Sequence, residues 1–235
     1  MIHITTALFR ALEAPPDEAA CVAENLVASS LMGHDSHGVL RVPEYVDLVR
    51  EGKIVPGAKI TVARRSGATA IVDCGLNFGP VGAKRAMEAC MEIARENRAA
   101  CAVTRRCGHV GRLGAYPQMA AEQGLIALAF CDSPVHGHFV VPWGGREGRL
   151  STNPIAYAVP TGSKPILADF STSVAPEGKI RWYRNEGKEL PLGWILDHEG
   201  KPATDPRAFY GPPRGSLLPL GGAAGYKGFA LSLLV

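Results

Sequence analysis

The chain has 235 residues, of which 46% are hydrophobic and 20% charged, a balance that excludes an intrinsically disordered chain and a coiled coil. The 25 Lys and Arg residues and the 22 Asp and Glu residues give a net charge of +3. Residues of the two signs are interspersed along the sequence, without a block of basic residues. Nucleic acid is therefore not an expected partner. The length indicates one large domain or two small ones.

The cysteines and the apolar runs indicate where the protein is found. The six cysteines form no C-x-x-C pair, and a chain of this length needs no disulfide scaffold. No apolar run approaches the roughly 20 residues of a membrane-spanning helix. The N-terminus lacks the basic start and long apolar stretch of a signal peptide. We therefore expect reduced thiols, a cytoplasmic location and no membrane partner.

The N-terminal part of the chain is predicted to be helical. Apolar residues recur at helical spacing between Thr5 and Met32, and Pro15-Pro16 divides this stretch into two helices. A third helix is predicted over residues 41–52, where Gly52 provides the stop.

From residue 60 onwards, predicted strands and helices alternate. The best-defined element is an amphipathic helix after Gly79-Pro80, whose apolar residues share one face. The predicted strands cover residues 60–62, 70–72, 99–103, 125–130, 155–159 and 166–168, and shorter helices cover 117–123 and 173–184. This alternation is typical of an α/β fold. The sequence therefore predicts an N-terminal helical segment, residues 1–60, and an α/β region, residues 61–235.

The end of the chain is predicted to be less regular. Residues 197–221 are mostly loop, and the last helix begins at Tyr226 without a stop signal before Val235. We expect the α/β region to be truncated at its C-terminal end.

Three common α/β signatures do not occur in the sequence: the dinucleotide-binding G-x-G-x-x-G, the phosphate-binding G-x-x-x-x-G-K-[ST] and the nucleophile elbow G-x-S-x-G. The nearest glycine-rich segment, residues 108–114, lies between a predicted strand and a predicted helix. Its backbone N–H groups are suited to holding a phosphate, and Arg112 favours an anion. A turn that only needs small residues explains the same pattern.

The most informative segment is Asp35-Ser36-His37-Gly38-Val39-Leu40-Arg41. If it is helical, His37 and Arg41 lie on one face, about 6 Å apart. Imidazole exchanges protons near neutral pH, and guanidinium holds a carboxylate through two parallel hydrogen bonds. These groups suit a substrate with a carboxylate beside a carbonyl or hydroxyl. The alternatives are that Ser36 caps a helix, that His37 is a structural histidine and that Arg41 forms a surface ion pair.

Two polar turns and a cluster of histidines carry further candidates. Residues 151–154 and 169–173 each adjoin a predicted strand, and spacing does not decide between ligand contacts and simple turns or caps. The histidines gather at His34 and His37 around Asp35, and at His136 and His138. They lack both a cysteine at ligand spacing and a metalloprotease glutamate. A metal-dependent hydrolase or lyase built on them is the alternative function.

With these residues in view, the chain resembles the malate/L-lactate dehydrogenase family, which lacks the Rossmann fold and includes ureidoglycolate, diketogulonate and cyclic-imine reductases. The resemblance runs in order through D-S-H-G-V-L-R at 35–41, G-H-V-G-R-L-G at 108–114, P-W-G-G at 142–145, S-T-N-P at 151–154, D-F-S-T-S at 169–173 and G-Y-K-G at 225–228. It implies the family's distinctive α/β fold, a homodimer, and hydride transfer between NAD or NADP and a small anionic substrate. That substrate is a malate- or lactate-like 2-hydroxy or 2-oxo acid, or a related imine.

The resemblance also implies roles for individual residues. His37 matches the family's proton donor, Ser36 its hydrogen-bonded partner and Arg41 the group that binds the substrate carboxylate. His109 matches a position that is the acid or base in some members, and Thr152 matches a substrate contact. The matches to cofactor contacts are His109, Val110, Gly111, Arg112, Leu113, Asp169, Phe170, Ser171, Thr172, Ser173, Tyr226 and Lys227. Family members continue past G-Y-K-G, so an inactive fragment of such a dehydrogenase is a further alternative.

Overall fold

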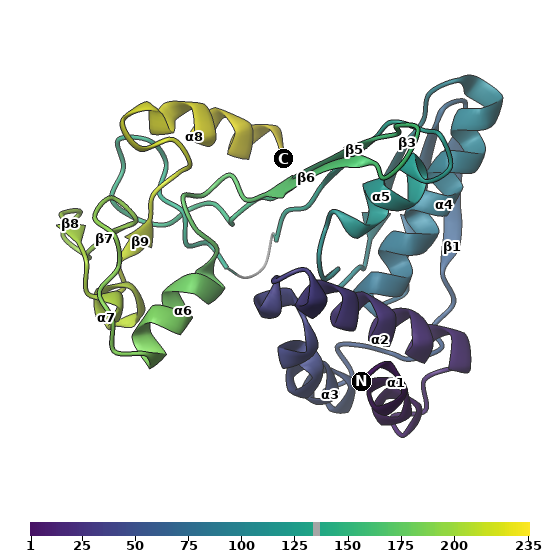
Figure 1. The fold of residues 1–235 in the computed structure, drawn as a ribbon, viewed down its shortest axis with the longest axis horizontal. Helices are drawn as coiled ribbons and strands as arrows, with labels where there is room; N and C mark the ends of the chain where they lie inside the picture. The colour runs from purple at the N-terminus through teal and green to yellow at the C-terminus, as the bar shows by residue number, and fades with distance from the viewer. Residues whose placement is uncertain (134–136) are drawn as a thin grey trace. The chain divides into compact units, whose positions relative to one another are not determined.

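The computed structural model describes residues 1–133 and 137–235. The chain divides into two compact units, and Figure 1 labels most of the helices and strands of both. The first unit comprises Met1–Ala127 and Ala158–Leu167, and the second comprises Leu128–Tyr157 and Ala168–Val235. The functional division at residue 60 stays a prediction.

Four helices build the core at one end of the first unit. They are α1 (Ile2–Arg10), α2 (Pro16–Leu31), α3 (Val42–Arg50) and the first turns of α4 (Gly79–Asn97). The predicted break at Pro15-Pro16 is confirmed, because Pro16 opens α2 at a position that needs no backbone N–H donor. The side chains that fill the core include Phe9, Val22, Leu26, Tyr45 and Phe78.

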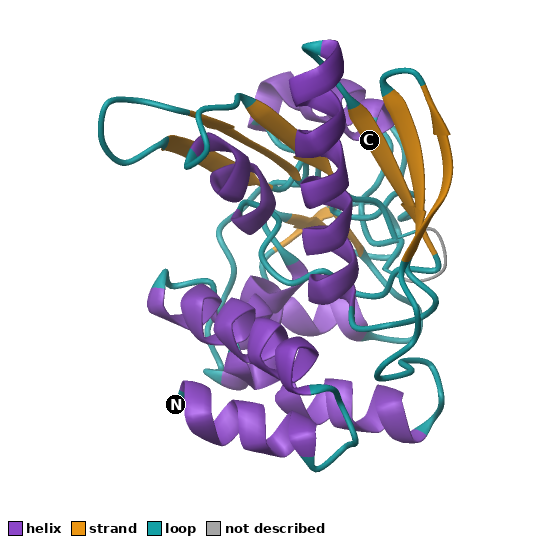
Figure 2. Cartoon of the chain, turned by 90° about the vertical axis from the view of Figure 1, so that its right-hand side faces the viewer, coloured by secondary structure: helices purple, strands orange, loops and turns teal. Residues whose placement is uncertain are grey.

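A three-stranded sheet lies against α4 in the same unit. Its strands are β1 (Thr61–Ser66), β2 (Thr69–Asp73) and β3 (Cys101–Arg105), in the order β1-β2-β3. The turn between β1 and β2 makes that pair antiparallel, whereas α4 connects the parallel pair β2 and β3 and packs on both. Figure 2 shows α4 running alongside this sheet. The short helix α5 (Ala115–Ala121) follows.

The strands predicted in the middle of the chain are confirmed. They are β4 (Ala127–Phe130), β5 (Ile155–Val159) and β6 (Ile166–Phe170), and their sheet has the order β4-β5-β6. The boundaries of the two units fall within these strands.

The second unit has its own apolar core, to which α6 (Glu177–Asn185) contributes Ile180. A small sheet of order β8-β7-β9 packs in this core, with β7 at Ile195–Leu196, β8 at Pro202–Ala203 and β9 at Ser216–Leu217. Strand β7 pairs antiparallel with both of its neighbours. The core residues are Val140, Ala175, Ile180, Leu190, Ile195, Phe209 and Leu217.

The prediction that residues 197–221 are mostly loop is confirmed, although the segment holds three short elements that were not predicted. Strand β8 (Pro202–Ala203), helix α7 (Pro206–Tyr210) and β9 lie there. Two-residue strands are too short to show a periodic pattern, and α7 depends on Asp205, whose side chain accepts a hydrogen bond from the Arg207 backbone N–H. The final helix, α8 (Gly225–Leu234), begins one residue before the predicted start.

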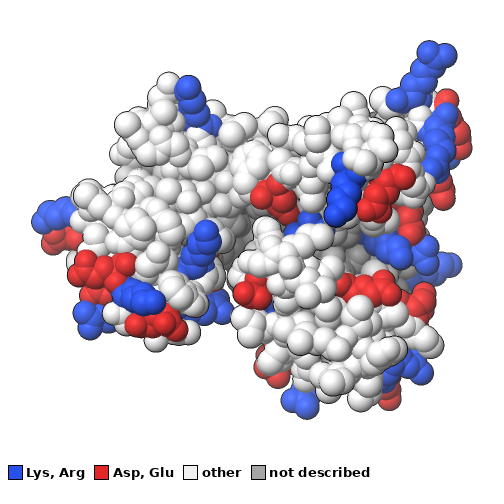
Figure 3. Space-filling model, viewed as in Figure 1, with Lys and Arg blue, Asp and Glu red and all other residues white. Residues whose placement is uncertain are grey.

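Charged residues of both signs lie close together on the molecule. Figure 3 shows Lys and Arg beside Asp and Glu on the face in view, and many of them form exposed ion pairs such as Arg85–Glu88. Among residues 1–133 and 137–235, none of the helices has the length and apolar character needed to cross a membrane.

Candidate active site

Residues 35–41 form two short 3₁₀ turns instead of the continuous helix considered above. The turns, η1 (Asp35–His37) and η2 (Val39–Arg41), are separated by Gly38, whose backbone is extended with φ −95° and ψ −152°. A β-carbon on Gly38 would lie 2.1 Å from the Ser30 Oγ of α2, so this interruption depends on close contact with that helix. His37 and Arg41 are therefore not neighbours on one helical face.

Arg41 instead folds back towards the first turn. Its Nε donates a hydrogen bond to the Ser36 carbonyl oxygen at 2.6 Å, and one terminal nitrogen donates to a Glu44 carboxylate oxygen at 2.5 Å. The ion pair considered above therefore exists. These two bonds use two of the five N–H groups of a guanidinium. The Arg41 side chain is 21% exposed, which leaves one part of it open to solvent.

Ser36 contacts the imidazole of His37. The Ser36 Oγ lies 2.9 Å from the His37 Nδ1, and the 3₁₀ turn has no side-chain cap. The interpretation of Ser36 as a partner of the imidazole is therefore favoured over that of a helix cap. On its other side, the His37 ring stacks on the ring of His109, with 5.3 Å between centroids and 25° between planes.

His109 is held by a tyrosine of α3. The Tyr45 hydroxyl lies 2.8 Å from the His109 Nδ1 and donates to the His109 carbonyl oxygen at 3.0 Å. Because a phenol has one hydrogen and a carbonyl only accepts, we assign the Nδ1 as the donor to the hydroxyl oxygen. The lone pair then lies on Nε2, a buried nitrogen without a hydrogen-bond partner in the part of the chain that the structure describes.

Both imidazoles are neutral near pH 7. Burial, together with the positive charges of Arg41 and His34, lowers the pKa of His37 to about 4. Burial, Arg41 and His37 lower the pKa of His109 to about 3. Two stacked rings that can accept protons thus lie beside a cation that suits a carboxylate.

The glycine-rich loop 108–114 continues from His109 and packs tightly on α2. Gly111 has φ +73°, and a β-carbon there would lie 2.2 Å from the Asn25 Oδ1. Arg112 is 5% exposed, and its guanidinium donates to the Gln118 Oε1 at 3.1 Å. The Arg112 side chain is thus largely shielded from solvent, and the cofactor contacts predicted for Val110, Gly111, Arg112 and Leu113 stay predictions.

In the second unit, two of the predicted segments meet. The backbone N–H and the hydroxyl of Thr172 both donate to the Thr152 carbonyl oxygen, at 3.0 and 3.1 Å. The Thr172 carbonyl oxygen in turn accepts from the Leu220 N–H at 2.9 Å. The hydroxyls of Ser171 and Ser173 bond to each other at 3.1 Å. Residues 169–173 are thereby fixed against the turn that carries Thr152.

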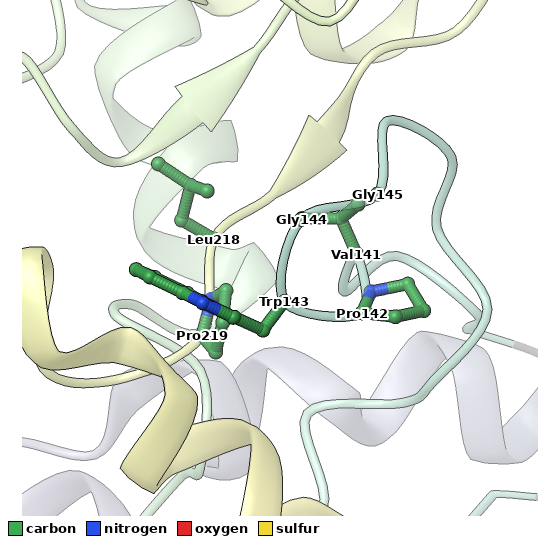
Figure 4. Close-up of a pocket in the computed structure, with 7 residues that line it drawn as sticks. All are labelled: Val141, Pro142, Trp143, Gly144, Gly145, Leu218 and Pro219. Atoms are coloured by element: carbon green, nitrogen blue, oxygen red, sulfur yellow. The ribbon is translucent and has the colours of Figure 1, made fainter.

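The predicted contacts Tyr226 and Lys227 lie in the first turn of α8, and Trp143, which contacts Tyr226, lines a pocket of about 330 Å³. The Trp143 ring packs edge-on against Tyr226, with 6.1 Å between centroids. A β-carbon on Gly225 would lie 2.5 Å from the Trp143 ring, so a glycine is needed here. Figure 4 shows the lining residues Val141, Pro142, Trp143, Gly144, Gly145, Leu218 and Pro219.

The structure therefore gathers the predicted residues into two groups, one in each unit. Ser36, His37, Arg41 and His109 lie together in the first unit, whereas Thr152, residues 169–173 and Tyr226-Lys227 belong to the second.

Sequence reasoning missed Tyr45 and Trp143 as site residues. The spacing of Tyr45 is typical of a core position in an amphipathic helix. Its hydroxyl group was the feature of the sequence that could have indicated a polar partner. Trp143 lies between Pro142 and Gly144. A large aromatic residue in such a turn is the feature that could have indicated a binding site.

The alternative of a metal-dependent hydrolase or lyase requires a cluster of ligands, and the part of the chain that the structure describes contains none. No three side chains of His, Cys, Asp or Glu gather there as a metal site would require. His136, which that alternative used, lies outside the described residues.

Comparisons with known proteins agree with one another. The profile of the malate/L-lactate dehydrogenase family matches residues 1–235. A malate dehydrogenase of Pyrococcus horikoshii is 40% identical over 228 residues, which are 95% of this chain and 62% of that protein. A (2R)-3-sulfolactate dehydrogenase (NADP(+)) of Chromohalobacter salexigens is 35% identical over 99% of this chain and 67% of its own length.

The fold has solved counterparts as well. The structure of a putative malate/lactate dehydrogenase from E. coli matches with a TM-score of 0.93 and 32% identity. The match covers 99% of this chain and 64% of that one. The chain thus spans a little under two thirds of the length of the Pyrococcus and E. coli proteins, and the α/β architecture is confirmed.

Proposed function

The chain belongs to the malate/L-lactate dehydrogenase family, and from this membership we propose that it is an NAD- or NADP-dependent oxidoreductase of 2-hydroxy and 2-oxo acids or related imines. The names of the relatives, which act on malate and on 3-sulfolactate, support a small anionic substrate. The observation that carries the proposal is the arrangement of His37 and His109, which stack beside Arg41. It combines proton transfer with carboxylate binding.

Arg41 is the proposed site for the substrate carboxylate. Its Nε and one terminal nitrogen are held by the Ser36 carbonyl and by Glu44, so the guanidinium is fixed in place. A planar guanidinium in a fixed position binds a carboxylate with defined orientation, which a flexible ammonium does not. Thr152 is the second proposed substrate contact.

The two histidines are the proposed proton carriers. Because both rings are neutral near pH 7, each can accept the proton of a substrate hydroxyl during oxidation. In the direction of reduction, His37 returns that proton to the substrate oxygen. Ser36 orients the His37 ring, and Tyr45 leaves the lone pair of His109 on the unpartnered Nε2.

The residues of the second unit fit a nucleotide. Trp143 and Tyr226 are 45% and 51% exposed beside the pocket, and exposed aromatic rings stack on planar bases. Lys227, next to Tyr226, supplies a charge suited to a phosphate, and the segment 169–173 is anchored nearby through Thr172 and Leu220. The bound nicotinamide cofactor supplies the hydride chemistry. These residues and the loop 109–113 are the proposed cofactor contacts.

A direct assay tests this proposal. The absorbance of NADH and of NADPH is followed with oxaloacetate, with pyruvate and with a cyclic imino acid. We expect oxidation of at least one reduced cofactor by at least one of these substrates, without added metal. Turnover that requires a divalent metal, or no turnover with any pair in either direction, would contradict the proposal.

We further propose a cytoplasmic homodimer. The reduced cysteines support the location. Analytical ultracentrifugation tests the assembly, and a monomer at micromolar concentration would contradict it. The comparisons lend no support to a metal-dependent hydrolase or lyase.

A further inference from the structure

Two cysteines that are far apart in the sequence lie at the ends of neighbouring strands. Cys74 follows β2 directly, and Cys107 follows β3 by two residues. The parallel register pairs Asp73 with Arg105, and the Cys74 N–H continues the ladder by donating to the Arg105 carbonyl oxygen at 2.9 Å. The two side chains therefore emerge at the same edge of the sheet.

The two sulfur atoms meet against α4. A β-carbon on Gly82 would lie 2.7 Å from the Cys74 Sγ and 3.2 Å from the Cys107 Sγ, so a glycine lets the helix approach both. A hydrogen bond with the Cys107 side chain lowers the pKa of the Cys74 thiol. The thiols are thus in contact, and both are reduced in this structure.

The surroundings of this pair differ from those of other cysteines in the chain. Cys74 is fully buried, whereas Cys107 is partly exposed. By contrast, burial raises the pKa of Cys21, Cys90 and Cys131, which keeps those thiols protonated and unreactive. A partly exposed cysteine beside a buried one is an arrangement in which one thiol reacts with an oxidant and the other resolves the product.

We propose that Cys74 and Cys107 are a redox modification site, at which a peroxide converts the two thiols into a reversible disulfide. The function proposed above does not involve this pair, so the inference stands independently of it.

The reaction with hydrogen peroxide balances in two steps. The Cys107 sulfur attacks one peroxide oxygen, the O–O bond breaks, and a sulfenic acid and one water are formed. The Cys74 thiol then loses its proton and its sulfur attacks the Cys107 sulfur. The S–S bond forms, the S–O bond breaks, and the leaving hydroxide takes up the Cys74 proton as a second water. The two sulfurs together lose two electrons, and the peroxide is reduced to two waters.

This disulfide would act on the loop that carries His109. The Cys107 Sγ lies 3.8 Å from the Gly79 carbonyl oxygen, so a disulfide that repositions this sulfur disturbs its contact with Gly79. Gly79 also packs on the same loop, since a β-carbon on it would lie 2.1 Å from the His109 carbonyl oxygen. Oxidation two residues before His109 therefore alters the surroundings of that imidazole.

Peptide mapping of the intact chain tests the proposal. The folded protein is treated with hydrogen peroxide, its remaining thiols are blocked with N-ethylmaleimide, and the digest is analysed by mass spectrometry. We expect a cross-linked peptide pair containing Cys74 and Cys107, two blocked thiols fewer than in the untreated protein, and full recovery with dithiothreitol. Absence of the Cys74–Cys107 pair, whether other cysteines cross-link instead or Cys107 becomes sulfinic acid with Cys74 still reduced, would overturn the proposal.

Matched variants and a second readout separate a specific site from general oxidation. Cys131→Ser should keep the cross-link, whereas Cys107→Ser should abolish it. In the wild-type protein, peroxide should shift the imidazole NMR signals of His109 and dithiothreitol should restore them. If these signals stay unchanged while the disulfide forms, the link from the thiol pair to the His109 loop is wrong.

Discussion

Within the candidate active site, Arg41 influences the protonation of the histidines and forms hydrogen bonds with neighbouring residues. Burial lowers the pKa of both His37 and His109 most, and the positive charge of Arg41 is the next cause. The hydrogen bonds of Arg41 reach Ser36 and Glu44. A substrate carboxylate bound there would reduce the net positive charge beside the two rings. It would thereby raise their pKa values towards the range useful for proton transfer.

Replacing Arg41 tests its proposed role in binding. Arg41→Lys keeps the charge and loses the planar pair of donors, so we expect kcat/KM for a 2-oxo acid to fall by an amount equivalent to about 2–4 kcal/mol. The exposed Arg50→Lys variant is the control and should leave kcat/KM unchanged. If Arg41→Lys impairs the acid and its amide equally, Arg41 is structural and the carboxylate binds elsewhere.

Tyr45 is expected to contribute to stability through its hydroxyl. Tyr45→Phe keeps the ring in the core with Phe9 and Phe78 but leaves the His109 Nδ1 without its partner. We expect the free energy of unfolding to fall by about 1–3 kcal/mol, as for other buried polar groups that lose a partner. Urea denaturation measures this, with Tyr157→Phe on β5 as the control. Equal stability of both variants would show that the His109 contact contributes nothing.

The sequence predicted the closeness of His37 and Arg41 but neither its geometry nor the stacking of His37 on His109. The closeness of His37 and Arg41 was expected from helical spacing, whereas Gly38 interrupts the helix and Arg41 returns through the Ser36 carbonyl. That difference arises from the contact of Gly38 with Ser30. Contacts between segments distant in the sequence leave no local pattern, and the bond between Tyr45 and His109 was missed for the same reason.

Among the elements, the loop 108–114 fixes His109 because it is packed on α2. Gly111 supports this packing with a left-handed backbone and a close approach to Asn25. The loop therefore tolerates side chains at some of its glycines and not at others.

A pair of glycine substitutions tests this statement. Gly111→Ala should lower the free energy of unfolding by about 1–3 kcal/mol, because its φ is positive and its β-carbon meets the Asn25 side chain. Gly108→Ala is the matched control, since nothing lies within 4 Å of its β-carbon. Thermal unfolding compares the two, and a Gly108→Ala variant that loses as much stability as Gly111→Ala would contradict the account of the loop.

Elements with a repeating apolar pattern or a buried apolar run were predictable, and the two-residue strands were not. Helix α4 shows its apolar face over several turns, and α1, α2 and the β1–β6 strands were recognised as well. By contrast, β8 and β9 have two residues each and exist because they pair with β7. Their pairing is set by the core around Ile195 and Leu217, which no local pattern of residues 197–221 reveals.

For the whole molecule, the two histidines link stability to pH. The pKa values of the folded state are about 4 for His37 and about 3 for His109, both below 6.5. Between pH 6.5 and about 3 the unfolded chain therefore takes up protons that the folded chain does not. This contribution to stability is complete above pH 6.5 and is lost as the pH falls through that window. His109→Gln should make the fall in melting temperature shallower, whereas the exposed His198→Gln should not. Parallel curves for both variants would contradict the burial of a neutral His109.

The division into two units was not predictable from the sequence. The strands β4, β5 and β6 look like ordinary members of an α/β alternation, yet each is divided between the units. Sequence spacing also left open which candidates share a unit. The hydrogen bonds of Thr172 to Thr152 and of Leu220 to Thr172 decide this for the second unit.

The central claim, that His37 transfers a proton in a nicotinamide-dependent reaction of a 2-oxo acid, is tested by comparing the wild-type chain with His37→Gln. The measurement is the steady-state oxidation of NADH or NADPH by a 2-oxo acid, with cofactor binding followed by fluorescence. We predict turnover by the wild type, a kcat lower by roughly 10²–10⁴-fold in His37→Gln, and an unchanged cofactor Kd. An equal kcat in the two proteins would remove His37 from the mechanism.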